Sequence, residues 1–488
     1  MPWKRRRSPP TSVNSMKDDR TQPLSQPGDT LSPGRLLTDV DGTIVSATDL
    51  GTRIQSGQTI QTNAILDFLL FGTVLAPHGL VQGMQTLFPG ETSTANEKKP
   101  YLKLDLELSR LDADGYVDLL DAMLEKILAG FRGPKKALLL SGGIDSAIIL
   151  SYLTPQQDMP CITWSATTPS ETKQSMDKRF SFVTAAAFGV KRHEIVHMDY
   201  ERDVEAYRAF ISRSRIPHIF SNVAPYIRMA ERAQEMGVTE CALGQNVDTL
   251  FLAYPAPHYV SIFQKLHRFL PLKLIAPFVR KRFQYLLAEK SLVREFAYFK
   301  SAGVFPGPWI NVPETYLKEH EAAVERFVPK GKTIEQRIQL VEEFLSEGRR
   351  SENYQREIPR FWGVESVLPY YHDDFIQALL RMPPKLLRLG GGYDKQVFQK
   401  LARKRGVPEP VIGHVKKGLS YSAKYVLTHR LHLSVWDEVE KDELLNHFVD
   451  IKRIRQKFQD DFYTFDLLRS LHVWFEEVAK PLNLKLEQ

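Results

Sequence analysis

Apolar residues follow two periods along the chain, and the change from one to the other outlines its parts. From residue 36 to about 100, short apolar stretches alternate with Gly and Thr, as in GTRIQSGQTIQ, which predicts β-hairpins. The segment AILDFLLFGTV within this part has a helical pattern instead. Between 101 and 130 apolar residues recur at helical spacing, which predicts a helix leading into the next unit.

The next unit alternates strand-like and helix-like segments. KKALLLSGGIDSAIILSYL predicts an apolar strand over 137–140, a glycine turn and an apolar helix over 146–153, and the strand-like PCITWSATT and KRHEIVHMDY follow. Strands that alternate with helices in this way are typical of a parallel α/β sheet. After Tyr254 the pattern stays helical to the end of the chain, and we find no internal repeat. The expected fold is therefore α/β, with a helical C-terminal part and a small β-containing N-terminal module.

Composition adds a third segment at the N-terminus. Residues 1–35 are rich in Ser, Pro, Thr, Gln and charge, which predicts a disordered arm. The chain is therefore expected to consist of this arm, the small module at 36–100 and a larger domain at 101–488. Of the net charge of +7, this arm supplies +4, from seven Lys and Arg against three Asp. The remainder is close to neutral, so we do not expect nucleic acid as a partner.

Cysteine content and hydropathy exclude two further classes of protein. Two cysteines, Cys161 and Cys241, are too few for a disulfide framework or a structural zinc site, both of which draw on four or more ligands from Cys and His clusters. No run of 18 apolar residues occurs, and the basic start MPWKRRRSPP is followed by no apolar segment. We expect a cytoplasmic protein that does not bind a membrane.

The strongest chemical signal is the loop Ser141–Ser146, which has the sequence SGGIDS and lies between the predicted strand and helix. The small residues Gly142 and Gly143 let backbone N–H groups approach a polyphosphate, and the helix N-terminus adds the positive end of its dipole. Asp145 would repel phosphate unless Mg²⁺ bridges the two. A tight turn capped by Asp is the alternative. Candidate ATP-binding residues are Leu140, Ser141, Gly142, Gly143, Asp145, Ser146 and, at the ends of later strands, Ser165 and Gly244.

This loop resembles the pyrophosphate-binding loop of the ATP pyrophosphatases, a group that includes asparagine synthetase, and further segments resemble asparagine synthetase in order. LGQNVDTLFLAYP at 243–255 is similar to the family's SGEGxDExFxGY. The resemblance implies that Asp145 and Asp248 hold Mg²⁺ against the pyrophosphate of ATP. Gln245 replaces the family's catalytic Glu and Thr249 replaces another Glu, and a neutral amide cannot act as a general base.

Two later segments extend the resemblance. The segment at 363–384, GVESVLPYYHDDFIQALLRMPP, is similar to the family's GxExRxPFLDxxFVxxALxLP. Packing accounts for most of this match, and only Glu365 is a candidate site residue. KQVFQKLARKRGVPEPVIGHVKKGLSYS at 395–422 aligns Lys416 with a family Lys that reaches the α-phosphate region. An ammonium there can stabilise negative charge during both reaction steps. A solvated basic helix face is the alternative.

The N-terminal module resembles only the end of the family's glutaminase domain, at 64–94. That domain uses an N-terminal cysteine as nucleophile, whereas position 2 is Pro2 and the first cysteine is Cys161. We therefore do not expect glutamine hydrolysis by this chain. The nucleophile would be ammonia or an amine of the substrate, delivered freely, by a separate glutaminase or by a peptide-delivery protein.

One further motif points to a different class. Asp39-Val40-Asp41-Gly42-Thr43 matches the DxDGT loop of haloacid-dehalogenase phosphatases. That loop needs a buried strand before it, and only Leu36-Leu37 stands there. An Asp-Gly hairpin turn explains the match better.

The resemblance as a whole implies a ligase that uses Mg-ATP. It would adenylate a small-molecule or peptide carboxylate, release pyrophosphate, and transfer the acyl group to an amine or ammonia. Relatives with altered N-terminal domains include β-lactam synthetases and lasso-peptide cyclases. Ammonia-dependent asparagine synthesis and a non-catalytic ATP-binding or partner-binding protein on the same fold stay open as alternatives.

Overall fold

The structure is a computed structural model of the chain, and it describes most of the sequence beyond the N-terminal arm. The described residues are 36–38, 44–46, 53–87, 91–94, 97–100, 104–154, 158–167, 175–269, 291–301, 304–305, 307–327, 330–345, 347–387, 395–414, 426 and 432–487.

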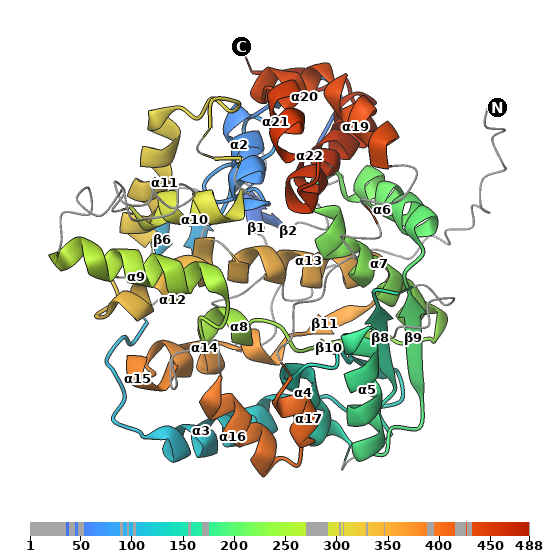
Figure 1. Cartoon of the computed structure of the whole chain (residues 1–488), viewed down its shortest axis with the longest axis vertical. Helices are drawn as coiled ribbons and strands as arrows, with labels where there is room; N and C mark the ends of the chain where they lie inside the picture. The colour runs from blue at the N-terminus through green and yellow to red at the C-terminus, as the bar shows by residue number, and fades with distance from the viewer. Residues whose placement is uncertain are drawn as a thin grey trace.

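The centre of the molecule is a five-stranded sheet in the order β11-β10-β7-β8-β9, with every neighbouring pair parallel. The strands are short and lie in the lower right of Figure 1. This sheet, with helices packed on it, confirms the α/β fold predicted from the sequence. The strands are β7 (Lys136–Leu139), β8 (Cys161–Ser165), β9 (His193–His197), β10 (Glu240–Leu243) and β11 (Glu365–Val367).

Both faces of this sheet are buried, because successive side chains of a strand point to opposite faces and each face has its own apolar core. In β7, Ala137 and Leu139 belong to one buried cluster, whereas Leu138 belongs to the other. In β10, Cys241 and Ala242 divide in the same way. This burial explains why the strands read as continuous apolar runs in the sequence.

Helices cover both faces of the sheet and continue to the C-terminus, as the sequence predicts. On one face α3, α4 and α16 contact one another, and on the other α7 contacts β8 and α13 contacts β11. The helices are α2 (Thr62–Phe71), α3 (Ala113–Leu128), α4 (Ile144–Leu153), α5 (Met176–Ala187), α6 (Tyr200–Ser214), α7 (Phe220–Glu235), α8 (Val247–Leu250), α9 (Pro255–Phe269), α10 (Leu292–Lys300), α11 (Glu314–Phe327), α12 (Ile334–Leu345), α13 (Glu347–Phe361), α14 (Asp373–Leu380), α15 (Pro384–Leu387), α16 (Gln396–Lys404), α17 (Glu409–Ile412), α19 (His432–Glu440), α20 (Glu443–Phe448), α21 (Ile451–Phe458) and α22 (Phe462–Trp474).

The N-terminal segment forms small β-structures around α2. β1 (Leu36–Thr38) pairs antiparallel with β2 (Ile44–Ser46) and β4 (Gln85–Thr86), β5 (Glu91–Thr94) pairs with β6 (Glu97–Pro100), and β3 (Thr59–Ile60) pairs with the C-terminal β12 (Lys485–Leu486). The pairing of β1 with β2 confirms the predicted hairpin, although its Asp-Gly turn at 39–43 lies outside the described residues. Figure 1 shows α2 beside α22, and the two helices are in contact. The domain boundary near residue 100 stays a prediction.

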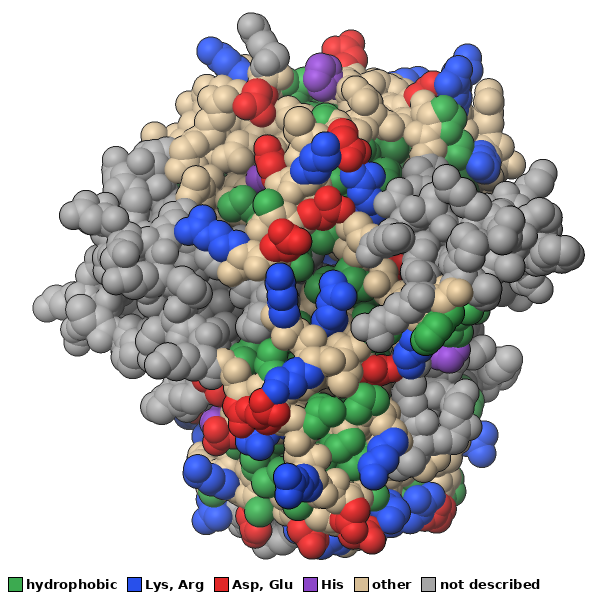
Figure 2. Space-filling model, turned by 90° about the vertical axis from the view of Figure 1, so that its left-hand side faces the viewer, with side chains coloured by type: hydrophobic (Ala, Val, Ile, Leu, Met, Phe, Trp, Pro, Cys, Tyr) green, Lys and Arg blue, Asp and Glu red, His purple; other side chains and the backbone are tan. Residues whose placement is uncertain are grey.

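The surface shown in Figure 2 carries charges of both signs. Lys and Arg side chains are interspersed with Asp and Glu over this face, and hydrophobic side chains occur in small groups between them. Both cysteines are buried free thiols. Among the described residues, no helix combines the length and the hydropathy that crossing a bilayer requires.

The turn after β7 depends on Gly142. This residue has φ of +69°, a conformation that side chains disfavour, and a Cβ built on it would lie 2.3 Å from the carbonyl oxygen of Asp177. The loop therefore lies directly against the start of α5. Gly189 has almost the same φ, +67°, but a Cβ built on it would have no atom within 4 Å.

These two glycines give a matched test of the close approach. Gly142→Ala and Gly189→Ala both add the backbone strain of a positive φ, about 1 kcal/mol. We expect Gly142→Ala to lose about 1–3 kcal/mol more, because the loop or α5 must also shift. Urea denaturation followed by circular dichroism measures both. Equal losses in the two variants would show that the loop does not need this contact.

Candidate functional site

The strand order creates a crevice between β7 and β10. From β7 the chain proceeds through β8 to β9 on one side of the sheet, and then crosses to β10 and β11 on the other side. Ligands of open α/β sheets bind at such a switch point, outside the carboxyl ends of the strands. Both loops predicted from the sequence begin there: Ser141–Ser146 follows β7 and Gly244–Asp248 follows β10.

The first loop is shaped by its own hydroxyl groups and leaves a helix N-terminus open. The backbone N–H of Ser141 donates to Ser146 Oγ at 3.1 Å, and that hydroxyl donates to the carbonyl of Gly143 at 3.2 Å. Gly143 is the N-cap of α4, and no side chain caps this end of the helix. The N–H groups of a helix N-terminus and the positive end of the helix dipole are suited to an anion.

The second loop packs directly on the first. A Cβ built on Gly244 would lie 2.8 Å from the backbone nitrogen of Ser146, so only glycine allows this approach. Asn246, two residues after Gly244, has a positive φ of +92°. Its Nδ2 donates to Glu343 Oε1 at 3.0 Å and to the carbonyl of Tyr370 at 3.3 Å. Asn tolerates this left-handed conformation better than most residues.

Tyr370 brings a third strand end into the site. It follows β11, is fully buried, and donates its hydroxyl to the carbonyl of Asp145 at 2.7 Å. Burial and the nearby Asp145 carboxylate both raise the pKa of Tyr370 well above its ordinary value, so the hydroxyl keeps its proton. The ends of β7, β10 and β11 are thus joined through Asp145, Asn246 and Tyr370. Sequence reasoning did not single out Asn246 or Tyr370.

A single lysine connects the two acidic residues of the site. Lys395 Nζ lies 2.7 Å from Asp145 Oδ1 and 2.8 Å from Asp248 Oδ1, and only about one tenth of its side chain is exposed. Burial acts to lower the pKa of Lys395, but the two carboxylates outweigh this and hold it above its ordinary value. Lys395 therefore carries a positive charge between Asp145 and Asp248.

Lys395 is a further residue of the candidate site that the sequence did not single out. It is the N-cap residue of α16, and the contacts of α16 with α3 and α4 place it at the start of α4. The available signal was its place as the first residue of the family-like segment at 395–422.

A narrow pocket opens beside the two loops. It has a volume of about 30 Å³, and apolar side chains from β7, β8, β10 and α7 form most of its wall. Four of the predicted site residues line it, together with five others: Leu140, Ser141, Gly244, Gln245, Leu139, Trp164, Tyr226, Met229 and Leu243.

The remaining predicted residues lie in different places. Ser165 is buried at the end of β8, where its hydroxyl is 2.9 Å from that of Thr167. Glu365 begins β11 and pairs in register with Glu240, the first residue of β10, so it lies at the amino end of the strands, opposite the crevice. Its carboxylate is exposed and forms an ion pair with Arg360 at 3.0 Å. The structure does not bring Glu365 to the other site residues, and Lys416 lies outside the described residues.

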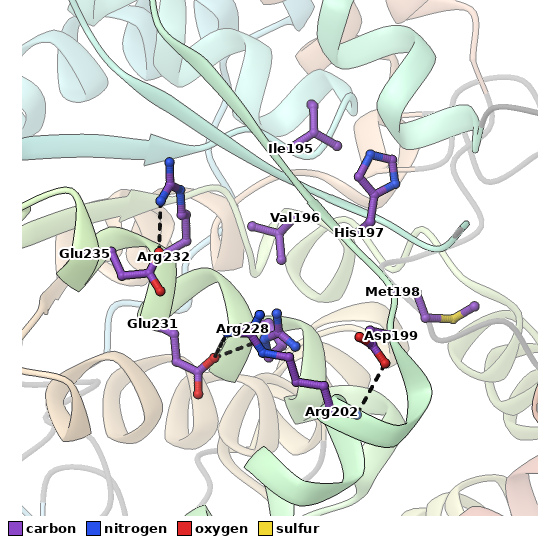
Figure 3. A pocket seen from close by; sticks show the side chains of 10 residues that line it. All are labelled: Ile195, Val196, His197, Met198, Asp199, Arg202, Arg228, Glu231, Arg232 and Glu235. Carbon is purple, nitrogen blue, oxygen red and sulfur yellow. Dashed lines mark hydrogen bonds and ion pairs between the residues drawn. The ribbon is translucent and has the colours of Figure 1, made fainter. Parts of the chain in front are cut away.

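A larger groove of about 420 Å³ lies along β9, at the edge of the sheet (Figure 3). It contains none of the predicted residues. Its arginines are already paired: Arg228 with Asp203 at 2.9 Å and Arg232 with Glu235 at 2.8 Å. We therefore place the candidate site at the crevice between β7 and β10 and not at the larger groove.

A family comparison covers this part of the chain. The asparagine synthase family matches residues 134–476, which include both loops and the helical C-terminal part. A search of curated proteins finds no match. Among solved structures, an NMN synthetase from Francisella tularensis matches at 15% identity, over 52% of this chain and 93% of that chain, with a TM-score of 0.21. Because the family match spans more than half of its length, the chain belongs to the asparagine synthase family and is an ATP-dependent ligase of the amide-forming kind.

Proposed function

We propose that the chain adenylates a carboxylate with Mg-ATP, releases pyrophosphate, and transfers the acyl group to an amine or ammonia. The observation that supports this most directly is the meeting of two acidic loops at the switch point, where Asp145 and Asp248 share one buried ammonium group. Two carboxylates that can share a cation can also share a metal ion. The uncapped N-terminus of α4 provides N–H groups for phosphate beside them.

The donor set fits Mg²⁺, which prefers carboxylate oxygens and usually binds through one or two of them plus phosphate. Asp145 and Asp248 would hold the ion. When bound, it supplies positive charge that offsets the charge of the leaving pyrophosphate. The close contact of Gly142 with α5 and of Gly244 with the first loop fixes the backbone around this position.

Lys395 prepares this site before ATP binds. Without a cation between them, Asp145 and Asp248 would repel each other and the triphosphate. The ammonium of Lys395 holds them together, and its long side chain allows it to turn towards phosphate oxygens when ATP occupies the loops.

The reaction then proceeds in two steps. A carboxylate oxygen of the substrate attacks the α-phosphorus of ATP, and the bond from that phosphorus to pyrophosphate breaks, which leaves an acyl-adenylate. The amine nitrogen next attacks the acyl carbon, the bond to AMP breaks, and the amine loses a proton as the amide forms. Lys416 would stabilise negative charge in both steps. Gln245, at the pocket, can orient the amine by hydrogen bonding but cannot accept its proton.

The source of the amine defines the finer proposal. The nucleophile in this proposal is ammonia or a substrate amine, supplied freely, by a separate glutaminase or by a peptide-delivery protein. The departures at Gln245 and Thr249 favour a specialised amide ligase over ammonia-dependent asparagine synthesis.

Product analysis separates these proposals. The chain is incubated with Mg-ATP under three conditions: with aspartate plus ammonium, with an acid fraction of cell extract, and with no carboxylate substrate as a control. AMP and pyrophosphate that depend on the extract support the specialised ligase, and AMP that depends on aspartate identifies the asparagine-forming alternative. Tight ATP binding without AMP under either condition would contradict catalysis and support a binding protein.

The shared cation gives a first prediction about stability. Lys395→Met removes the ion pair of the buried Asp145, and we expect it to lower the free energy of unfolding at pH 7 by about 3 kcal/mol. Lys400→Met is the matched control on the same helix, because Lys400 pairs with the exposed Asp114. We expect this substitution to lower the free energy of unfolding by less than about 1 kcal/mol. Similar losses in both variants would mean that the buried bridge has no special role.

A second prediction separates binding from turnover. Asp145→Asn should abolish both the Mg²⁺-dependent binding of ATP and ATP–pyrophosphate exchange, because it removes a metal ligand. Lys416→Ala should bind ATP but exchange at least about 100-fold more slowly, since its charge acts on the reacting groups. Lys417→Ala is the neighbouring control and should behave like wild type. Wild-type exchange by Lys416→Ala would refute the role given to Lys416.

A further inference from the structure

A cluster of metal-ligand side chains lies outside the ATP site. Asp67 is on α2, His78 is in the segment between α2 and β4, and His320 is on α11. All three are buried: Asp67 and His320 are 0% exposed and His78 is 6% exposed. Segments about 250 residues apart in sequence therefore place two imidazoles and one carboxylate together in the interior.

The ligand atoms of the three residues converge on one point. His78 Nδ1 lies 2.9 Å from Asp67 Oδ2, and His320 Nε2 lies 2.7 Å from Asp67 Oδ1. One ligand atom from each residue lies within 4.8 Å of both others. The hydroxyl of Tyr316, one turn before His320 on α11, donates to Asp67 Oδ1 at 2.7 Å and places an oxygen beside the three ligand atoms.

Groups around the cluster orient these ligand atoms. His78 Nε2, on the far side of the ring from Asp67, lies 3.5 Å from Glu319 Oε2. The backbone N–H of Leu75 donates to Asp67 Oδ2 at 2.9 Å. Metal-bound histidines characteristically direct their second nitrogen to a carboxylate, and ligating carboxylates are themselves hydrogen-bonded. The cluster has the first feature at His78 and the second at Asp67, whereas Nδ1 of His320 is buried without a hydrogen-bond partner.

Charge also favours an ion in this place. A carboxylate with no exposed surface is costly to bury unless a positive charge compensates it. In the structure both imidazoles are hydrogen-bonded to Asp67 and compensate it; a divalent cation bound between neutral imidazoles would take over that role and also offset the nearby Glu319. The two nitrogen ligands favour a transition metal such as zinc over Mg²⁺ or Ca²⁺, which prefer oxygen.

We propose that Asp67, His78 and His320 bind a divalent transition-metal ion of the zinc type. Ligand atoms of a tetrahedral zinc site lie about 3.3 Å apart, given bonds of about 2.0–2.1 Å to nitrogen. The imidazole nitrogens of His78 and His320 lie 2.9 and 2.7 Å from different oxygens of Asp67, so these spacings would open by about half an ångström, and one ligand atom from each residue already lies within 4.8 Å of both others. The ion would connect α2 and the segment after it to α11, and would thereby anchor the N-terminal segment to the helices of the larger domain.

A second group of similar composition carries less weight. Asp442, His472 and Glu476 also lie close together, but they include a single imidazole. Asp442 caps α20 through the N–H groups of Leu444 and Leu445, and Glu476 pairs with Lys480. These two carboxylates already cap a helix and form an ion pair, so we do not expect them to bind a metal ion. His472 is therefore a control for His320 in the metal analysis.

Metal analysis of the full chain, purified without an affinity tag, tests the proposal. Inductively coupled plasma mass spectrometry should find about one equivalent of a transition metal per chain, as isolated or after incubation with Zn²⁺ and desalting. His320→Gln should lose at least about 90% of it. The exposed His447→Gln and the buried His472→Gln should keep it. A chelator should lower the melting temperature of wild type but not of His320→Gln, because an ion that binds only the folded state stabilises it.

The proposal does not depend on the folding of one variant. Wild-type chain stripped of metal and reconstituted with Co²⁺ should show visible ligand-field absorption bands that Zn²⁺ displaces. A wild-type chain that holds less than about a tenth of an equivalent of metal before and after incubation would overturn the proposal and leave a hydrogen-bonded cluster. Equal metal content in wild type and in folded His320→Gln would overturn it as well.

Discussion

The candidate site depends on one buried ammonium group placed between two carboxylates. Asp145 and Asp248 come from loops after different strands, and Lys395 stands at the start of a helix, 250 residues after Asp145. The side chain of Asp145 is largely buried whereas that of Asp248 is half exposed, and the ammonium of Lys395 offsets the repulsion between the two carboxylates. The same arrangement suits the binding of Mg-ATP, in which a metal ion and a lysine share the charge of the phosphates.

The topology of the sheet explains why these groups meet. A parallel sheet with both faces buried leaves only the strand ends for chemistry, and the change of direction between β7 and β10 separates two adjacent loops there. The glycines at 142 and 244 then let backbone approach backbone. Tyr370 and Asn246 fix the loops from the side of β11. Core packing and site geometry are thus consequences of the same strand order.

Sequence alone predicted the parallel sheet and the SGGIDS turn, because both are encoded in short contiguous segments. The predicted strand at 137–140 is observed at 136–139, and the helix predicted at 146–153 begins two residues earlier. Lys395 was missed because its partners are distant in sequence, and only its place at the start of the family-like segment distinguishes it from the basic residues that follow it. Glu365 was chosen by resemblance, whereas strand register, which a local pattern does not reveal, places it at the amino end of β11.

The central claim is that a substrate carboxylate attacks the α-phosphorus of ATP at this crevice. Transfer of an isotope tests it most directly. The carboxylate that supports turnover is labelled with ¹⁸O, and the products are analysed by mass spectrometry and ³¹P nuclear magnetic resonance. The account predicts one labelled oxygen in AMP and none in pyrophosphate. Formation of ADP with labelled inorganic phosphate would show attack at the γ-phosphorus and would contradict the account.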